Sequence, residues 1–261
     1  MTLPYFINGT GEPILFLHGL GNNKHLWDSQ HELSSKYQLI IPDLRGHGEN
    51  DIKTDITLPN LAADVLELMD FLSIGSTNIC GLSMGGLVAL QMFKQAPKRV
   101  KALILTNTTA YCIPWLISSN AYDNIRKLSE EEVKTYIVQH SLHKKDQEII
   151  QKAERSFEIH KEAFLEAAQN CSKANYVTLL PFINIPCLII NGLKDQVTPP
   201  LLSYQMKWGI PHARFRSLNN GHLSNIESTQ QFNKLIVDFM EEKHWLASNR
   251  MPFFTIKTYF S

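Results

Sequence analysis

Short runs of apolar residues alternate along this chain with amphipathic helical patterns, and this alternation restricts the folds that the chain can adopt. Five runs are apolar enough to be strands buried on both faces, and a sixth is weaker. The five are residues 13–18, 37–43, 78–81, 100–107 and 185–191, and the weaker run is 213–218. Apolar residues at helical spacing fill residues 25–33, 61–72, 84–95 and 232–240. Strands that alternate with helices predict an α/β fold, with a mostly parallel sheet flanked by helices on both faces.

One segment interrupts the alternation. From about residue 114 to residue 175 there is no strand pattern, and the segment is polar with scattered apolar residues such as Val133 and Phe164. We interpret it as two to four helices inserted between two strands, forming a cap over the strand ends. A separate domain is the alternative, although no Gly/Ser-rich linker flanks the segment. The predicted organisation is a discontinuous core of residues 1–113 and 176–243, a helical cap of residues 114–175, and a C-terminal tail of residues 244–261.

Composition narrows the possible partners. The 261 residues include 25 Lys and Arg and 25 Asp and Glu, so the formal net charge is zero. Without a basic field we expect neither a nucleic acid nor a membrane surface as the partner. A small-molecule substrate is the expected partner, and the chain is expected to be a monomer or a homodimer.

The cysteines and the N-terminus bear on the compartment. The first ten residues lack the pattern of a signal peptide, and no apolar stretch is long enough to cross a bilayer. The four cysteines are scattered without a C-x-x-C pair, so we expect no disulfide framework and no metal site. We predict a cytoplasmic protein with buried thiols. The cysteines are Cys80, Cys112, Cys171 and Cys187.

The sequence Gly81-Leu-Ser-Met-Gly85 matches G-x-S-x-G, and it follows a predicted strand and opens a predicted helix. A nucleophilic serine in this context has to project from a very tight turn, where a Cβ on Gly81 or Gly85 would clash. The N-terminus of the following helix favours developing negative charge. The pattern therefore predicts Ser83 as a nucleophile, and a plain glycine-rich turn is the alternative.

A nucleophilic serine needs a base, and the base needs an acid that orients it. His222 lies in a turn-rich loop after the last predicted strand, and Asp195 lies just after the fifth. The order Ser83, Asp195, His222 is typical of this context, and the carboxyl ends of strands are where sites in open α/β sheets lie. His18 and His47 also stand beside glycines, but we interpret them as structural residues that position neighbouring loops.

The reaction also needs an oxyanion hole, formed by backbone N–H groups. We expect one N–H from Met84, which follows the nucleophile, and one from Leu20 in the loop His18-Gly-Leu-Gly21. A phosphate-binding loop is the alternative for this segment, but it matches neither common glycine-rich phosphate motif.

Together these features resemble the α/β-hydrolase superfamily, and within it the 3-oxoadipate enol-lactonase group and its esterase relatives. The stretches that carry the resemblance are His18-Gly-Leu-Gly21, Pro42-Asp-Leu-Arg-Gly-His-Gly48, Cys80-Gly-Leu-Ser-Met-Gly-Gly86, residues 96–107, Asn191-Gly-Leu-Lys-Asp195 and Gly221-His-Leu-Ser-Asn-Ile-Glu227. The resemblance implies a Ser–His–Asp hydrolase, without cofactor or metal, that cleaves a small carboxylic ester, thioester or lactone through an acyl-enzyme.

The substrate pocket is less well marked. In the lactonases a tryptophan and a basic residue of the cap help to receive a dicarboxylate, and no stretch of this chain clearly repeats that pattern. Trp115 at the start of the predicted cap either lines the pocket or belongs to the core. Further candidates for the lining are Gly19, Cys112 and Leu223.

The chain departs from the family at both ends. Members usually begin with two strands before the His-Gly loop, but only Pro4-Tyr-Phe-Ile7 precedes the turn here, so the first strand is expected to be absent. Residues 251–260 have the aromatic and β-branched content of a strand. They form either a frayed end or a segment that pairs with a sheet edge or another subunit.

Two other functions are compatible with the same residues. One is a cofactor-free perhydrolase or haloperoxidase-like enzyme in which peroxide is the nucleophile. The other is a small-molecule sensor that binds its ligand with little or no turnover.

Overall fold

A computed structural model describes residues 3–112 and 124–248 of the chain, with side chains as far as residue 242. Seven strands form one sheet in the order β1-β3-β2-β4-β5-β6-β7. All neighbouring strands are parallel except β1, which is antiparallel to β3. The strands are β1 (Tyr5–Asn8), β2 (Pro13–Leu17), β3 (Gln38–Pro42), β4 (Thr77–Leu82), β5 (Val100–Thr106), β6 (Cys187–Gly192) and β7 (Arg214–Leu218).

Helices cover both faces of this sheet because its central strands are apolar on both faces. In β2, Leu15 and Leu17 pack into the core on the side of α1 and α2, whereas Ile14 and Phe16 pack with Trp27 of η1 and with α9. The helices outside the inserted segment are η1 (Lys24–Ser35), α1 (Leu58–Phe71), α2 (Met84–Gln95), η2 (Pro97–Arg99), η4 (Val177–Phe182), α7 (Pro200–Gly209), α8 (Ser224–Glu227) and α9 (Thr229–Ser248).

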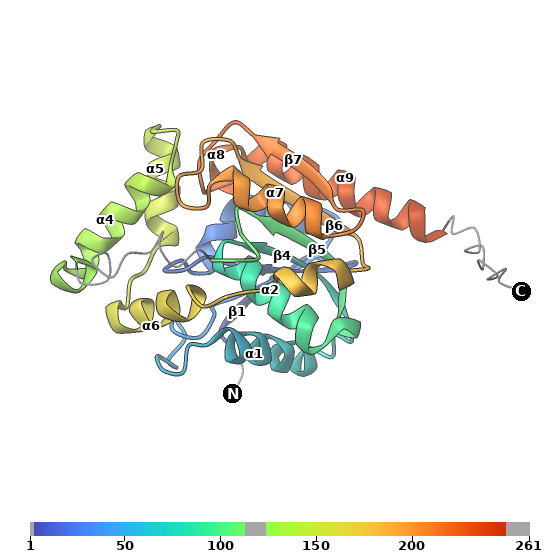
Figure 1. Cartoon of the computed structure of the whole chain (residues 1–261), viewed down its shortest axis with the longest axis horizontal. Coiled ribbons are helices and arrows are strands. Elements are labelled where there is room, and N and C mark those ends of the chain that lie inside the picture. The colour runs from blue at the N-terminus through green and yellow to red at the C-terminus, as the bar shows by residue number, and fades with distance from the viewer. Residues whose placement is uncertain (1–2, 113–123, 249–261) are drawn as a thin grey trace, which may run out of the picture.

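Three helices of the inserted segment, α4 (Glu130–Ser141), α5 (Gln147–Ser156) and α6 (Lys161–Cys171), follow β5 in the sequence and precede β6. They lie beside the edge of the sheet where the parallel strands have their carboxyl ends, which is the edge from which the chain passes from β7 into α8 (Figure 1). The start of α4 is fixed by a capping box, in which Ser129 and Glu132 each accept from the other's backbone N–H.

The sheet and the helical insertion agree with the sequence analysis. All six predicted strands are present, and two strands, β1 and β2, precede the His-Gly loop among the described residues. That the first strand usual in the family is missing stays a prediction. Helix α7 was not predicted, and α9 continues to Ser248, beyond the predicted start of the tail. Residues 251–260 lie outside the described part of the chain, so their pairing stays a prediction, as do the exact bounds of core and cap. Among the described helices, none combines the length and the apolar character that a membrane span requires.

Candidate active site

Ser83 lies in a strained turn between β4 and α2. Its backbone has φ 54° and ψ −117°, a conformation that non-glycine residues rarely adopt. The turn is held from both sides, because the Ser83 N–H donates to the Thr106 carbonyl at 3.0 Å and the Thr108 hydroxyl donates to the Ser83 carbonyl at 2.7 Å. The serine therefore projects from a fixed position at the carboxyl end of β4.

The neighbouring glycines permit this turn. A Cβ on Gly81 would lie 2.4 Å from the Gly85 carbonyl oxygen, and a Cβ on Gly85 would lie 2.1 Å from that of Leu17. A Cβ on Gly86 would lie 2.5 Å from the side chain of Thr108. Real Cβ atoms do not make such contacts, so these positions need glycine if α2 is to start this close to β2 and β5.

His222 and Asp195 form a buried hydrogen-bonded pair. His222 Nδ1 lies 2.8 Å from Asp195 Oδ2, and both side chains are almost fully buried. The other carboxylate oxygen, Oδ1, accepts from the backbone N–H groups of Val197 and Thr198 at 2.8 and 2.9 Å. Burial would raise the pKa of Asp195, but the charge of His222 and hydrogen bonds from His222, Asn107 and Thr198 outweigh it and lower that pKa.

Two residues that the sequence analysis did not identify hold this pair. Asn107 Nδ2 donates to Asp195 Oδ2 at 2.8 Å, and the Thr198 hydroxyl donates to the same oxygen at 2.7 Å. Asn107 is followed by Thr108, which binds the Ser83 carbonyl, so the serine turn and the aspartate are attached to adjacent residues after β5. Polar residues directly after a buried strand were the available signal.

The loop after β2 lies against the serine. A Cβ on Gly19 would be 3.4 Å from Ser83 Cβ. The buried His18 orders this loop, because its Nε2 accepts from the Leu44 N–H at 3.0 Å and its Nδ1 lies 2.9 Å from the Gly19 carbonyl. Burial lowers the pKa of His18, which keeps the ring neutral as this pairing requires. The predicted structural roles of His18 and His47 fit these positions, since His47 is also buried and packs 5.1 Å from the His18 ring.

The remaining site candidates lie around this loop and the histidine. Leu20 is partly exposed and contacts the apolar cores on both faces of the sheet, and Met84 is buried at the first position of α2. Leu223 is fully buried directly after His222. Cys112 is half-buried, and burial raises its pKa to about 11, so it is a neutral thiol. Trp115 lies outside the described residues.

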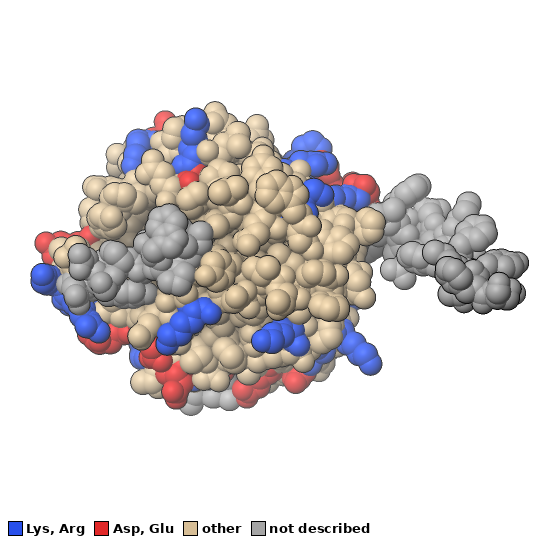
Figure 2. Space-filling model, in the orientation of Figure 1, with Lys and Arg blue, Asp and Glu red and all other residues tan. Residues whose placement is uncertain are grey.

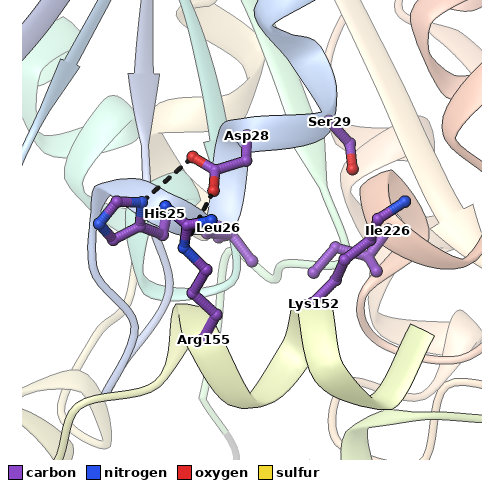
Figure 3. Close-up of a pocket in the computed structure, with 7 residues that line it drawn as sticks. All are labelled: His25, Leu26, Asp28, Ser29, Lys152, Arg155 and Ile226. Atoms are coloured by element: carbon purple, nitrogen blue, oxygen red, sulfur yellow. Dashed lines mark hydrogen bonds and ion pairs between the residues drawn. The ribbon is translucent and has the colours of Figure 1, made fainter. Parts of the chain in front are cut away.

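A surface cleft of about 280 Å³ lies on the seam between the insertion and the core (Figure 3). It is formed by η1, α5 and α8 and lined by His25, Leu26, Asp28, Ser29, Lys152, Arg155 and Ile226. An ion pair joins the two sides of the seam, because Asp28 of η1 lies 3.5 Å from Arg155 Nε of α5. None of the predicted catalytic residues lines this cleft.

Comparisons with known proteins identify the family to which this fold belongs. The chain is 30% identical to 3-oxoadipate enol-lactonase 1 of Acinetobacter baylyi, over 92% of this chain and 93% of that protein. The solved structure of an enol-lactonase from Burkholderia xenovorans LB400 matches with a TM-score of 0.85 and 28% identity, over 92% of this chain and 96% of that one. A thermophilic esterase from Thermogutta terrifontis matches with a TM-score of 0.83 and 26% identity, over 93% and 94% of the two chains. A model of the alpha/beta hydrolase fold family matches residues 12–229, and the chain belongs to that family.

Proposed function

We propose that this protein is a serine hydrolase that cleaves small carboxylic esters, thioesters or lactones through an acyl-enzyme on Ser83. The observation that carries the proposal is the buried pair of His222 Nδ1 and Asp195 Oδ2 at 2.8 Å, at the same end of the sheet as a serine in a strained turn. An aspartate bound to Nδ1 leaves Nε2 as the nitrogen that accepts a proton.

In the proposed reaction, His222 Nε2 removes the hydroxyl proton of Ser83 as the oxygen attacks the substrate carbonyl. Asp195 holds the imidazole in the required tautomer and stabilises its charged form. The N–H groups of Leu20 and Met84 stabilise the oxyanion, and a single donor of this kind is worth about 3 kcal/mol in other enzymes. His222 then protonates the leaving group and activates the water that cleaves the acyl-enzyme.

The substrate class rests on similarity. The relative from Acinetobacter baylyi is named an enol-lactonase, and one of the matching structures is an esterase. Hydrolysis of a lactone and hydrolysis of an open-chain ester both cleave an acyl C–O bond, and the residues proposed here would serve either reaction. We therefore expect activity on lactones as well as on open-chain esters.

The test is a fluorophosphonate label followed by mass mapping, together with a panel of ester, thioester and lactone substrates. We expect the label on Ser83, and we expect Ser83→Ala to lower turnover of a short p-nitrophenyl ester by at least about a thousandfold. Ser172→Ala, at the partly exposed end of α6, is the matched control and should leave turnover unchanged. Near-normal turnover by Ser83→Ala would refute the assignment. Peroxide-dependent halogenation without ester hydrolysis would favour the perhydrolase alternative.

A further inference from the structure

Glu227, at the end of α8, is only 4% exposed, and its carboxylate accepts hydrogen bonds from two separate segments. Its Oε1 accepts from the Gly221 N–H at 2.9 Å. Its Oε2 accepts from the N–H groups of His143 and Lys144 at 3.1 and 2.8 Å. One side chain therefore binds both the residue before His222 and the segment that follows α4.

These two segments also bind each other directly. The His222 N–H donates to the carbonyl of Ser141, the last residue of α4, at 2.7 Å. A Cβ on Gly221 would lie 2.7 Å from both the Ser141 carbonyl oxygen and the His143 nitrogen. The Lys144 ammonium adds a hydrogen bond to the Glu227 carbonyl at 2.7 Å. The end of α4 and the histidine loop thus form one close-packed unit around the Glu227 carboxylate.

The second seam between the inserted helices and the core is more open. There the Arg155 side chain is 66% exposed, and its pair with Asp28 borders the cleft shown in Figure 3. Ile226, the residue before Glu227, lines the same cleft. A shift of α4 can therefore reach the His222 loop by two routes, the bond from the His222 N–H to the Ser141 carbonyl and the contacts of the Glu227 carboxylate.

The chemistry of the contact requires a carboxylate. An ionised carboxylate is an acceptor only, with two oxygens for the three N–H groups, whereas an amide offers one acceptor and one competing donor. Burial raises the pKa of Glu227, and the hydrogen bonds from Lys144, Gly221 and His143 act against this rise. An amide of the same size can therefore satisfy one segment but not both.

We propose that Glu227 is a positioning residue that joins the end of α4 to the His222 loop, so that the imidazole is correctly placed only when α4 is docked. This role rests on the proposed function of His222 as the base. It assigns to the inserted helices a part in placing the catalytic histidine.

The test compares Glu227→Gln with Asp28→Asn, which removes the ion pair between Asp28 and Arg155 and leaves the histidine loop intact. The first readout is the low-field proton resonance of the hydrogen bond between His222 and Asp195. The second is kcat and KM for a short p-nitrophenyl ester, corrected by active-site titration with a fluorophosphonate. For Glu227→Gln we expect a shifted or broadened resonance. We expect kcat to be reduced at least about tenfold, with KM within about threefold of the wild-type value. Asp28→Asn should change each by less than about twofold.

Lys144→Met provides a second, milder variant, because it removes the ammonium contacts with the Glu227 carbonyl and the Ser228 hydroxyl but leaves the backbone N–H that binds the carboxylate. It should move the resonance in the same direction by a smaller amount. A normal resonance and a kcat within about twofold for titrated Glu227→Gln would overturn the proposal. If Ser83→Ala kept its activity, the proposed function would fail, yet the resonance would still report whether Glu227 positions His222.

Discussion

A single asparagine at the end of β5 connects three parts of the candidate site. Asn107 Nδ2 donates to Asp195 Oδ2 at 2.8 Å, and its Oδ1 accepts from the Ser224 hydroxyl at 2.7 Å. Its backbone carbonyl lies 2.9 Å from the Thr198 hydroxyl, whose single proton is shared between this oxygen and Asp195 Oδ2. The backbone has φ 45°, which asparagine tolerates better than most residues. The backbone conformation of Asn107 and its side-chain amide therefore both help to hold the Asp195 carboxylate in place.

We predict that Asn107→Asp inactivates the enzyme through charge. The substitution replaces the amide donor 2.8 Å from Asp195 by a carboxylate, and two carboxylates this close cannot both be ionised at neutral pH. Asp195 then loses its full charge, and kcat at pH 7 should fall about a hundredfold. Asn107→Gly keeps the backbone conformation and removes the donor without adding charge, so it should lose only about tenfold. Equal losses in the two variants would contradict the charge argument.

The same variant has an effect on stability with a defined sign. The pKa of Asp195 in the folded protein is lowered, so its ionised form stabilises the fold above the pKa of the unfolded chain. That contribution is lost as the pH falls through the folded pKa. Asn107→Asp raises the folded pKa, so its loss of stability should begin at a higher pH than in the wild type. Thermal unfolding between about pH 3 and pH 7 measures the difference.

The residues that could be predicted from the sequence are those with a local pattern. Ser83 stands in a five-residue motif, and Asp195 and His222 each follow a predicted strand. Glu227 and Asn107 lie in stretches that carry the family resemblance, but nothing in those stretches indicates what the two side chains do, because their roles depend on partners 83 to 88 residues away along the chain. Their functions become visible only when the sheet brings the strand ends together.

At the scale of elements, predictability follows burial. The strands of the sheet centre are buried on both faces, and their apolar runs identified them. Helix α7 was missed because Leu201, Tyr204 and Trp208 are exposed, so its apolar residues do not mark a buried face. The apolar pattern behind α9 ended at residue 240, whereas the helix continues to Ser248, because a pattern of apolar residues predicts the existence of a helix better than its last residue.

Two elements approach each other closely where α2 begins beside β2, and this contact gives a prediction with a matched control. Gly85→Ala would place a Cβ 2.1 Å from the Leu17 carbonyl oxygen, a backbone atom that cannot move aside. We expect a loss of about 3 kcal/mol or more in the free energy of unfolding. Gly75→Ala meets no atom within 4 Å and should stabilise by about 0.4–1 kcal/mol. Denaturant unfolding measures the free energy of unfolding of both variants. Equal values for the two would show that α2 can shift to accept the methyl group.

At the scale of the whole molecule, the charges are balanced and dispersed. The 25 basic and 25 acidic residues cancel, and on the face shown in Figure 2 they lie mainly around the rim, with both signs intermixed. Many are neutralised in pairs at the surface, such as Lys152 with Glu148 and Lys234 with Asp238. Such an arrangement produces little field beyond a Debye length.

The rate of substrate capture should consequently depend little on salt, even for a charged substrate. We predict that kcat/KM for an anionic p-nitrophenyl hemisuccinate, divided by that for the neutral acetate ester, changes less than about threefold between roughly 20 and 500 mM NaCl. The neutral ester corrects for any effect of salt on the chemical step. A fall in the ratio of more than about tenfold would mean that a local positive field collects anionic substrates. If the ratio stays constant, selectivity among esters has to come from short-range contacts around Ser83, which salt screens little.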